Sequence, residues 1–216
     1  MHNTIEKLKK RIAVSQQKQP ADFILRNAYV ADVFSLAWNN ADLVIADGII
    51  VAIDSTGSFE AIEEMDVMGR YVVPGLIDGH IHIESSMLIP SAFGDVLLPH
   101  GVTTVVTDPH EIANVSGVEG IHFMLKDAKK SPMDIFVMLP SCVPSTSFEN
   151  SGAILEADDL QPLLSHTCVL GLAEVMDYPS VLSGDEMMLA KLMMTQDANL
   201  RIDGHGAGLQ SEDIRG

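Results

Sequence analysis

Between residues 21 and 73, the chain alternates short runs of Val and Ile with turn residues. The runs are DFILRNAYV, ADLVIADGIIVAID and GRYVVPG, and Asn-Asn, Asp-Gly and Thr-Gly pairs mark the turns. Short β-branched runs between such turn signals are typical of strands. The Asp47-Gly48 pair lies between LVIA and IIVAID and predicts a tight hairpin. We therefore expect a small antiparallel sheet or half-sandwich in this segment.

At Pro74 the pattern changes, and apolar strand-like runs begin to alternate with helix-like segments. The expected strands are Gly75–His82, Val102–Thr107, Asp134–Leu139, Val169–Glu174 and Leu200–His205. The expected helices cover parts of Pro90–His100, Val118–Lys129, Ala157–Ser165 and Asp185–Asp197. Repeated β-α units of this kind form parallel sheets with right-handed crossovers.

The length of this second segment limits its fold. A (β/α)₈ barrel needs about 250 residues, whereas residues 74–216 leave room for only four to five βα units. The segment is either an open α/β sheet or a piece of a barrel, and we favour the piece because the chain stops in what resembles a new helix. We predict an α/β protein. An N-terminal helix and a small β-rich half-sandwich domain occupy residues 1–73, and the first part of a TIM-like barrel occupies residues 74–216.

Composition narrows the range of partners. Of the 216 residues, 13 are Lys or Arg and 30 are Asp or Glu, which gives a formal net charge of −17. Nucleic acids and anionic membranes are bound by clustered positive charge, so we expect neither as a partner. The hydrophobic fraction is 47% and the aromatic fraction is 5%. Such an aliphatic composition suits a parallel sheet that helices bury on both faces.

The N-terminal segment and the cysteines bear on location. Ile5, Leu8 and Ile12 fit one face of a short helix, and no apolar signal-peptide core follows the basic residues there. No run approaches the roughly 20 apolar residues of a membrane span. Cys142 and Cys168 lie in no CxxC pair, so neither a disulfide framework nor a zinc ribbon is indicated. We expect a soluble protein in a reducing cytoplasm.

Two histidines, His80 and His82, lie at the end of the first expected barrel strand. Residues two apart on a strand point to the same face, with Cα atoms about 6.6 Å apart, so both imidazoles can reach one metal ion at about 2.1 Å. The apolar run VVPGLIDG before them places the pair at the carboxyl end of the strand, where barrel enzymes hold their active sites. Taken alone, the pair could equally be two ordinary half-buried histidines.

Two later strand ends carry further metal-ligand residues. Glu174 closes the apolar run VLGLA, and a carboxylate there costs desolvation energy unless it is paired or bound to a metal. His205 follows LRIDG and precedes glycines that allow a sharp turn. Each residue also has a simpler interpretation. Glu174 could be an exposed carboxylate just past the strand end, and His205 could be a histidine in a loop. The order His-x-His, Glu, His along three strand ends is more specific than any of its members.

Other polar residues follow the same strand ends. Asp108, His110 and Glu111 come after VTTVVT, where they could orient metal ligands or touch substrate. Asp108 could instead cap the next helix or form a turn. Glu84 and Ser85 follow the His pair as substrate-binding or ligand-orienting candidates, although the serines there could also cap a helix. Three further histidines lack such a setting and are expected at the surface or at helix ends: His100, His122 and His166.

Four segments together resemble the N-terminal half of the bacterial adenine deaminases, a family within the amidohydrolase superfamily. They are PGLIDGHIHIESS, GVTTVVTDPHEIANVSG, GLAEVMD and IDGHGAG. PGLIDGHIH alone marks only the superfamily, whereas the continuation HIESS, the run TDPHEIANV and the glutamate in GLAEVM are more particular. The resemblance extends over nearly the whole chain, including its β-rich N-terminal segment.

The resemblance implies a binuclear metal site at the mouth of a distorted (β/α)₈ barrel. His80 and His82 would bind one metal, Glu174 would bridge both, and His205 would bind the other. Many relatives use a carboxylated lysine as the bridge, whereas the subfamily that this chain resembles has a glutamate there. The divalent metal would be manganese or iron, with zinc possible, because imidazole and carboxylate ligands alone do not choose among them.

The reaction that the resemblance implies is the hydrolysis of adenine to hypoxanthine and ammonia, by a hydrolase of carbon–nitrogen bonds in cyclic amidines. The family pattern continues on later strands with another histidine and with an aspartate that binds metal and moves the proton. That aspartate is expected beyond Gly216, so no catalytic residue is assigned with certainty within the chain. We therefore expect a truncated chain that is inactive on its own. Open strand edges would also favour a homo-oligomer.

Two other readings stay open. The chain could belong to another metal-dependent amidohydrolase, one that acts on a cyclic amide or an amino sugar. It could also be a non-catalytic fragment or a regulatory partner that keeps the fold but not the site. Ammonia release from adenine tests the first alternative, and metal analysis of the isolated chain tests the second.

Overall fold

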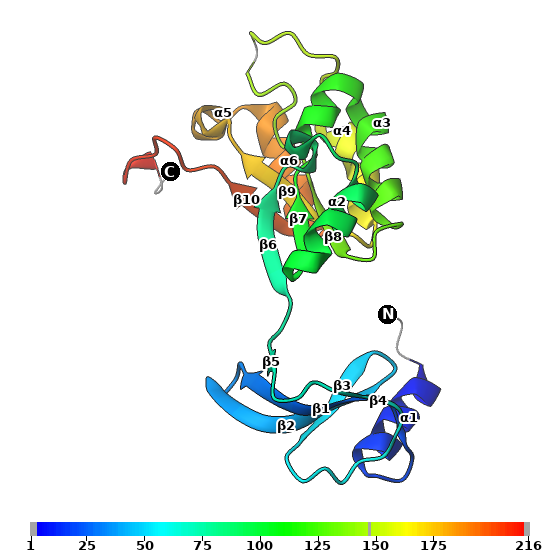
Figure 1. Cartoon of the computed structure of the whole chain (residues 1–216). Coiled ribbons are helices and arrows are strands. Elements are labelled where there is room, and N and C mark those ends of the chain that lie inside the picture. Colours follow the sequence, from blue (N-terminus) through cyan, green and yellow to red (C-terminus); the bar gives the residue numbers. More distant parts are fainter. Residues whose placement is uncertain (1–3, 147, 214–216) are drawn as a thin grey trace. The chain divides into compact units, whose positions relative to one another are not determined.

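The computed structural model describes residues 4–146 and 148–213. The chain divides into two compact units, Met1–Pro74 and Gly75–Gly216 (Figure 1). Among the helices of the described residues, none is long and apolar enough to cross a membrane.

The first unit is a mixed β-sheet with one helix. Its elements are α1 (Ile5–Ser15), β1 (Ala21–Asp32), β2 (Ala37–Ala46), β3 (Ile49–Asp54), β4 (Ala61–Asp66) and β5 (Tyr71–Val72). The strand order is β3-β2-β1-β4, and β5 also pairs with β1. The β2–β3 hairpin turns at Asp47 and Gly48, whose φ angles of 51° and 71° suit a two-residue type I′ turn.

The expectation of a purely antiparallel sheet is wrong for part of this unit. β1 pairs antiparallel with β2, but it pairs in parallel with β4 and β5. After β3 the chain crosses to the other side of β1 before β4 begins, so β4 runs in the same direction as β1. A run of short strands in the sequence does not reveal such a crossing.

Helix α1 forms where it was expected, but its apolar face is not the buried one. Thr4 caps the helix by accepting a hydrogen bond from the main-chain N–H of Lys7. Val14 is its buried residue and joins the core of the first sheet. Ile5, Leu8 and Ile12 lie exposed, and the Ile5 side chain is 73% exposed. The shared apolar face predicted the helix correctly, although that face is not where the helix packs on the sheet.

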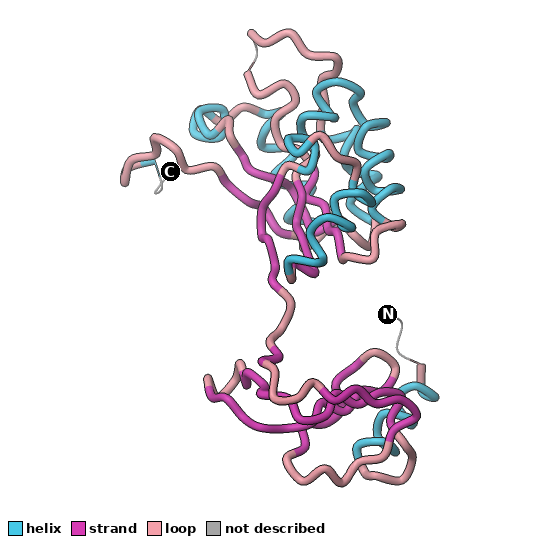
Figure 2. Tube along the Cα trace, viewed as in Figure 1, coloured by secondary structure: helices cyan, strands magenta, loops and turns pink. Residues whose placement is uncertain are grey.

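The second unit is a five-stranded parallel sheet with helices between its strands. Its strands are β6 (Leu76–Ile81), β7 (Val102–Thr107), β8 (Asp134–Leu139), β9 (Val169–Val175) and β10 (Arg201–Gly204). Their order is β10-β9-β8-β7-β6, and every pairing is parallel. Figure 2 shows these strands gathered together with the helices packed alongside. The expected α/β partial barrel after a small β domain is confirmed.

The connections of the second unit are mostly helical. They are η1 (Ile83–Ser86), α2 (Pro90–Leu97), η2 (Leu98–His100), α3 (His110–Ala128), α4 (Ala157–Leu160), η3 (Gln161–Ser165), α5 (Tyr178–Ser183) and α6 (Glu186–Asp197). Helix α3 begins eight residues before the expected start at Val118, and Gly117, with φ 60° and ψ −143°, kinks the helix just before that residue. Helix α5 was not expected. Its cap is Asp177, whose carboxylate accepts a hydrogen bond from the N–H of Ser180.

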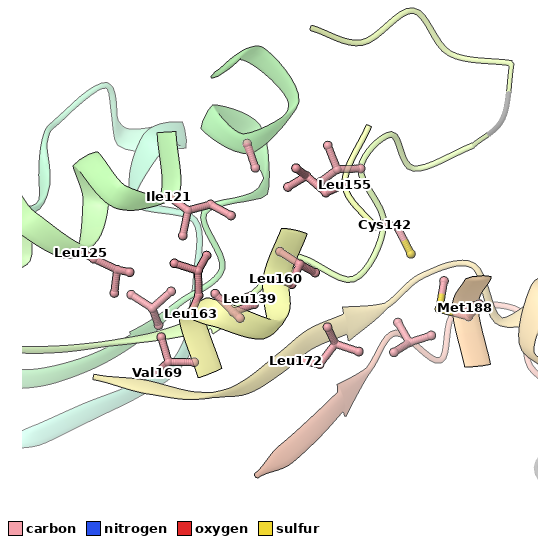
Figure 3. Packing of buried hydrophobic residues seen from close by; sticks show 14 residues of the cluster. Ile121, Leu125, Leu139, Cys142, Leu155, Leu160, Leu163, Val169, Leu172 and Met188 are labelled. Carbon is pink, nitrogen blue, oxygen red and sulfur yellow. The ribbon is translucent and has the colours of Figure 1, made fainter. Parts of the chain in front are cut away.

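The core of the second unit lies between its sheet and its helices (Figure 3). Leu139 from β8 and Leu172 from β9 are fully buried, as are Ile121 from α3 and Leu160 from α4. Burying one such side chain stabilises the fold by about 1.5–3 kcal/mol. This packing fixes the sheet whose carboxyl ends carry the candidate site.

Candidate metal centre

Four strand ends of the parallel sheet meet at one edge and bring titratable side chains together. His80 lies on β6, and His82 follows it. His110 begins α3, directly after β7. Glu174 lies on β9, and His205 follows β10. The carboxyl ends of parallel strands share one edge of a sheet, which explains why residues up to 125 positions apart in the sequence converge.

Glu174 lies at the middle of this group, and its side chain is 10% exposed. Its Oε1 atom lies 3.3 Å from Nε2 of His82 and 3.6 Å from Nε2 of His80. The same oxygen lies 4.0 Å from Nδ1 of His110. The other oxygen, Oε2, lies 3.8 Å from Nε2 of His205. One carboxylate thus faces four imidazoles. We call Glu174 together with His80, His82, His110 and His205 the four-histidine centre.

The spacing of three of these atoms fits one divalent ion. Nε2 of His80 lies 3.3 Å from Nε2 of His82, which closes a triangle with Oε1 of Glu174. Two ligands that each lie about 2.1 Å from a tetrahedral ion are roughly 3.4 Å apart. The triangle formed by these two nitrogen atoms and one oxygen atom has sides of 3.3, 3.3 and 3.6 Å, which match that spacing.

The protonation of His82 also suits a metal ligand. Its Nδ1 lies 2.9 Å from the main-chain carbonyl oxygen of Asp108. A carbonyl oxygen only accepts hydrogen bonds, so Nδ1 is the nitrogen that carries the proton and donates. In the neutral ring, Nε2 then presents its lone pair to Glu174 and His80. Ligating histidines commonly have such an acceptor behind them.

His80 has a comparable neighbour that the sequence did not single out. Its Nδ1 lies 3.4 Å from Oδ2 of Asp203 on β10. Asp203 lies two residues before His205, so strand alternation could have indicated that both point to the same edge. Its carboxylate is positioned to orient the His80 ring.

Asp108 and His110 form a close pair within the same group. Nδ1 of His110 donates to Oδ2 of Asp108 across 3.1 Å, and this hydrogen bond raises the pKa of His110. Burial raises the pKa of Asp108, whereas the bond to His110 opposes that rise. Oδ1 of Asp108 is buried without a hydrogen-bond partner. Ligand atoms of His82, Asp108, His110 and Glu174 all lie within 4.8 Å of one another, as a cation site requires.

The remaining candidates lie on the segments that follow β6 and β7. Ser85 donates its hydroxyl to Oε1 of Glu111, and Oε2 of Glu111 lies 3.7 Å from Nδ1 of His82. Glu84 accepts a hydrogen bond from the N–H of Ile112, and burial raises the pKa of Glu84. One oxygen of Glu84 and one of Glu111 are buried without a hydrogen-bond partner. The structure thus brings Ser85 and Glu111 together beside His82, and their role toward a substrate stays a prediction.

Two structural alternatives from the sequence are wrong. Asp108 does not cap α3, because Pro109 occupies the cap position and the Asp108 carboxylate bonds His110 instead. The serines after His82 do not cap α2, whose cap residue Ile89 makes no side-chain hydrogen bond. Ser86 donates to the carbonyl of Ile83 within η1.

Comparisons with known proteins identify the family to which this chain is similar. The model of the amidohydrolase family matches residues 71–215, about two thirds of the chain. An adenine deaminase of Lysinibacillus sphaericus is 62% identical over 216 residues, which are 100% of this chain and 37% of that protein. An adenine deaminase of Bacillus velezensis is 54% identical over 209 residues, 97% of this chain and 36% of that protein. The chain thus spans little more than a third of these relatives.

Solved structures share the fold at low sequence identity. An N-acyl-D-glutamate deacylase from Bordetella bronchiseptica, complexed with zinc and a phosphonate inhibitor, aligns with a TM-score of 0.60 and 16% identity, over 91% of this chain and 48% of that one. An atrazine chlorohydrolase from Arthrobacter aurescens, complexed with zinc, aligns with a TM-score of 0.61 and 16% identity, over 83% and 52%. Because the family model covers well over half of its length, the chain belongs to the amidohydrolase family.

Proposed function

We propose that this chain is the N-terminal part of a metal-dependent enzyme that hydrolyses adenine to hypoxanthine and ammonia. The observation that carries the proposal is the position of Glu174, whose two oxygens face four histidines from three other strand ends. The high identity to proteins named adenine deaminase supports adenine as the substrate. Metal-dependent hydrolysis of a carbon–nitrogen bond accounts for both observations.

The proposed metal site is binuclear. His80 and His82 would hold one divalent ion together with Oε1 of Glu174, and His205 would hold a second with Oε2. Manganese or iron is our first choice and zinc the next, because this mixture of imidazole and carboxylate ligands suits all three. Bound divalent ions would supply Lewis acidity and lower the pKa of a water molecule.

The residues of the chain itself would fix the ligands and handle protons. The carbonyl of Asp108 keeps the proton of His82 on Nδ1 and so leaves Nε2 free. The Asp108–His110 pair lies beside Glu174 and can hold or release a proton near the reacting water. In the overall reaction a bond forms between water oxygen and C6 of the purine, the bond from C6 to the amino nitrogen breaks, and a proton passes to the leaving amine.

Glu84, Ser85 and Glu111 are the residues that we propose near the purine. Glu111 faces His82 and accepts a hydrogen bond from Ser85, and one buried oxygen of each glutamate has no hydrogen-bond partner. A purine offers amino and ring N–H donors that such oxygens can accept. We propose water and this small molecule as the substrates, with no nucleic acid or membrane partner.

Two further features of the proposal concern location and assembly. We propose a cytoplasmic location, which the free thiols of Cys142 and Cys168 support. For the 216-residue chain taken by itself we also propose a homo-oligomer, because β6 and β10 are the two edges of its parallel sheet and unpaired strand edges favour association.

Hypoxanthine formation by the protein expressed from its complete reading frame tests the function. The protein is stripped with a chelator, reconstituted with Mn²⁺, Fe²⁺ or Zn²⁺, and supplied with adenine, a hydantoin or an N-acetyl amino sugar. Release of hypoxanthine and ammonia from adenine, lost in Glu174→Gln, is the expected result. Turnover of the hydantoin or the amino sugar without turnover of adenine would show another amidohydrolase. A protein that binds no metal and turns over none of them would be non-catalytic.

A further inference from the structure

A buried chain of hydrogen bonds joins α6 to the end of β9, where Glu174 lies. Nζ of Lys191 donates to the main-chain carbonyl of Ser141 across 2.8 Å. The hydroxyl of Ser141 in turn donates to the main-chain carbonyl of Glu174 across 2.6 Å. Lys191 and Ser141 are separated by 50 positions, so the contact is long-range in the sequence.

Both residues of this chain are almost fully buried. Lys191 is 7% exposed and Ser141 is 1% exposed. Burial lowers the pKa of Lys191, and the carboxylates of Glu156, Asp159 and Asp185 partly offset that effect. A buried ammonium group costs free energy unless it is well bonded. A leucine or methionine would fill the same space at lower cost, so the bond to Ser141 needs another explanation.

The position of Ser141 provides one. The ladder between β8 and β9 ends at the pair Leu139 and Leu172, two residues before Glu174. Beyond that pair, the hydroxyl of Ser141, which follows β8, donates a hydrogen bond to the main-chain carbonyl of Glu174. Lys191 thus holds the main chain of Ser141 in place, and the hydroxyl of Ser141 holds the main chain of Glu174 in place.

We propose that Lys191 and Ser141 are positioning residues that aim the Glu174 carboxylate into the four-histidine centre. The inference rests on the proposed metal-dependent function, since it assigns these residues a role in metal affinity. Outer residues that orient ligands typically contribute about 10- to 100-fold to metal affinity. A purely structural role predicts instead that both residues affect only stability.

Thr195 supplies the matched control. Its hydroxyl is fully buried on α6 and donates to the carbonyl of Lys191 across 2.8 Å, within the helix. Thr195→Val therefore removes a buried hydrogen bond from the same helix without touching the contact to Ser141 or Glu174. Its effect on stability and on spectra measures what a structural change in α6 does.

The first measurement uses the metal-free 216-residue chain. Ring resonances of His80, His82 and His205 in two-dimensional NMR spectra report the position of the Glu174 carboxylate. We expect Ser141→Ala and Lys191→Met to shift these resonances well beyond the shifts in Thr195→Val, while His122 stays unchanged. Shifts no larger than those of Thr195→Val would overturn the inference, and either variant suffices if the other fails to fold.

The second measurement is the Mn²⁺ dissociation constant of the same proteins. We expect Ser141→Ala and Lys191→Met to weaken binding by about 10-fold or more, with Thr195→Val near the wild type. Equal affinities in all four proteins would also overturn the inference. A wild-type chain that binds no Mn²⁺ would refute the proposed metal site instead, and the metal-free spectra would still decide whether these residues position Glu174.

Discussion

Oε1 of Glu174 lies 3.3 Å from Nε2 of His82, while the other oxygen of the same carboxylate points to His205 at 3.8 Å. A carboxylate that presents its two oxygens to different histidines can bridge two ions. Each oxygen would then belong to a separate metal position, which makes the two positions distinguishable by mutation.

Replacing His205 should remove one metal position and leave the other. In His205→Asn, the pair His80 and His82 keeps its contacts to Oε1. We expect the bound Mn²⁺ after reconstitution to fall to about half of the wild-type amount, measured by plasma mass spectrometry. His122→Asn, which changes an exposed histidine of α3, is the control. Loss of all metal in His205→Asn would argue against two separate positions.

Replacing Asp127 should remove a part of the stability that depends on pH in a defined direction. Its buried carboxylate accepts hydrogen bonds from Lys130 and from the N–H and hydroxyl of Ser91 at the start of α2. These bonds hold the pKa of Asp127 below its usual value, the bond from Lys130 most strongly. Lys130 is 64% exposed, so solvent weakens its share of the energy. We expect Asp127→Asn to cost about 1–2 kcal/mol in the free energy of unfolding at pH 7.

The sign of this pH dependence follows from the lowered pKa. A carboxylate with a folded pKa below its unfolded value of about 3.9 stabilises the fold above that value. The contribution is lost as the pH falls through the folded pKa. Urea unfolding of Asp127→Asn and the wild type should therefore converge at acidic pH, whereas Asp134→Asn, at an exposed carboxylate, should match the wild type throughout. A constant difference down to the acid limit would contradict this account.

Gly171 should tolerate no side chain. It lies on β9 opposite Arg201 of β10, and a Cβ atom there would lie 1.8 Å from the main-chain oxygen of Arg201. Gly171→Ala must displace β10, which leads directly to His205. We expect a loss of about 2 kcal/mol in stability and weaker Mn²⁺ binding. Gly79→Ala, on β6 with open space around the new Cβ, is the matched control for thermal unfolding. Equal unfolding midpoints for the two variants would show that β10 can move without cost.

Much of the fold could be predicted because it follows from local patterns. All five strands of the parallel sheet were expected within a few residues, although only β8 and β9 are largely buried and β6 and β10 are mostly exposed. The order of His80, His82, Glu174 and His205 placed them at strand ends, and topology then brought them together. The parallel pairing of β4 and the early start of α3 were missed, because a crossing and a kink at Gly117 depend on tertiary contacts. Ser141 and Lys191 were missed for the same reason, whereas strand alternation from His205 could have indicated Asp203.

A polypeptide of these 216 residues should release far less ammonia from adenine than the protein expressed from its complete reading frame. The relatives are nearly three times as long, and the family resemblance puts a further metal-binding aspartate in the part that this chain does not include. Coupled ammonia assays of both proteins, loaded with the same metal, make the comparison. Equal turnover per chain would show that the 216 residues hold a complete catalytic site.

Calorimetric titration of Mn²⁺ into the metal-free 216-residue chain and its Glu174→Gln variant tests the central claim most directly. The substitution keeps the size of the side chain and removes the charge that faces four histidines. The account predicts saturable binding to the wild type and binding at least about 100-fold weaker in Glu174→Gln. Equal binding by both proteins, or no binding by either, would contradict it.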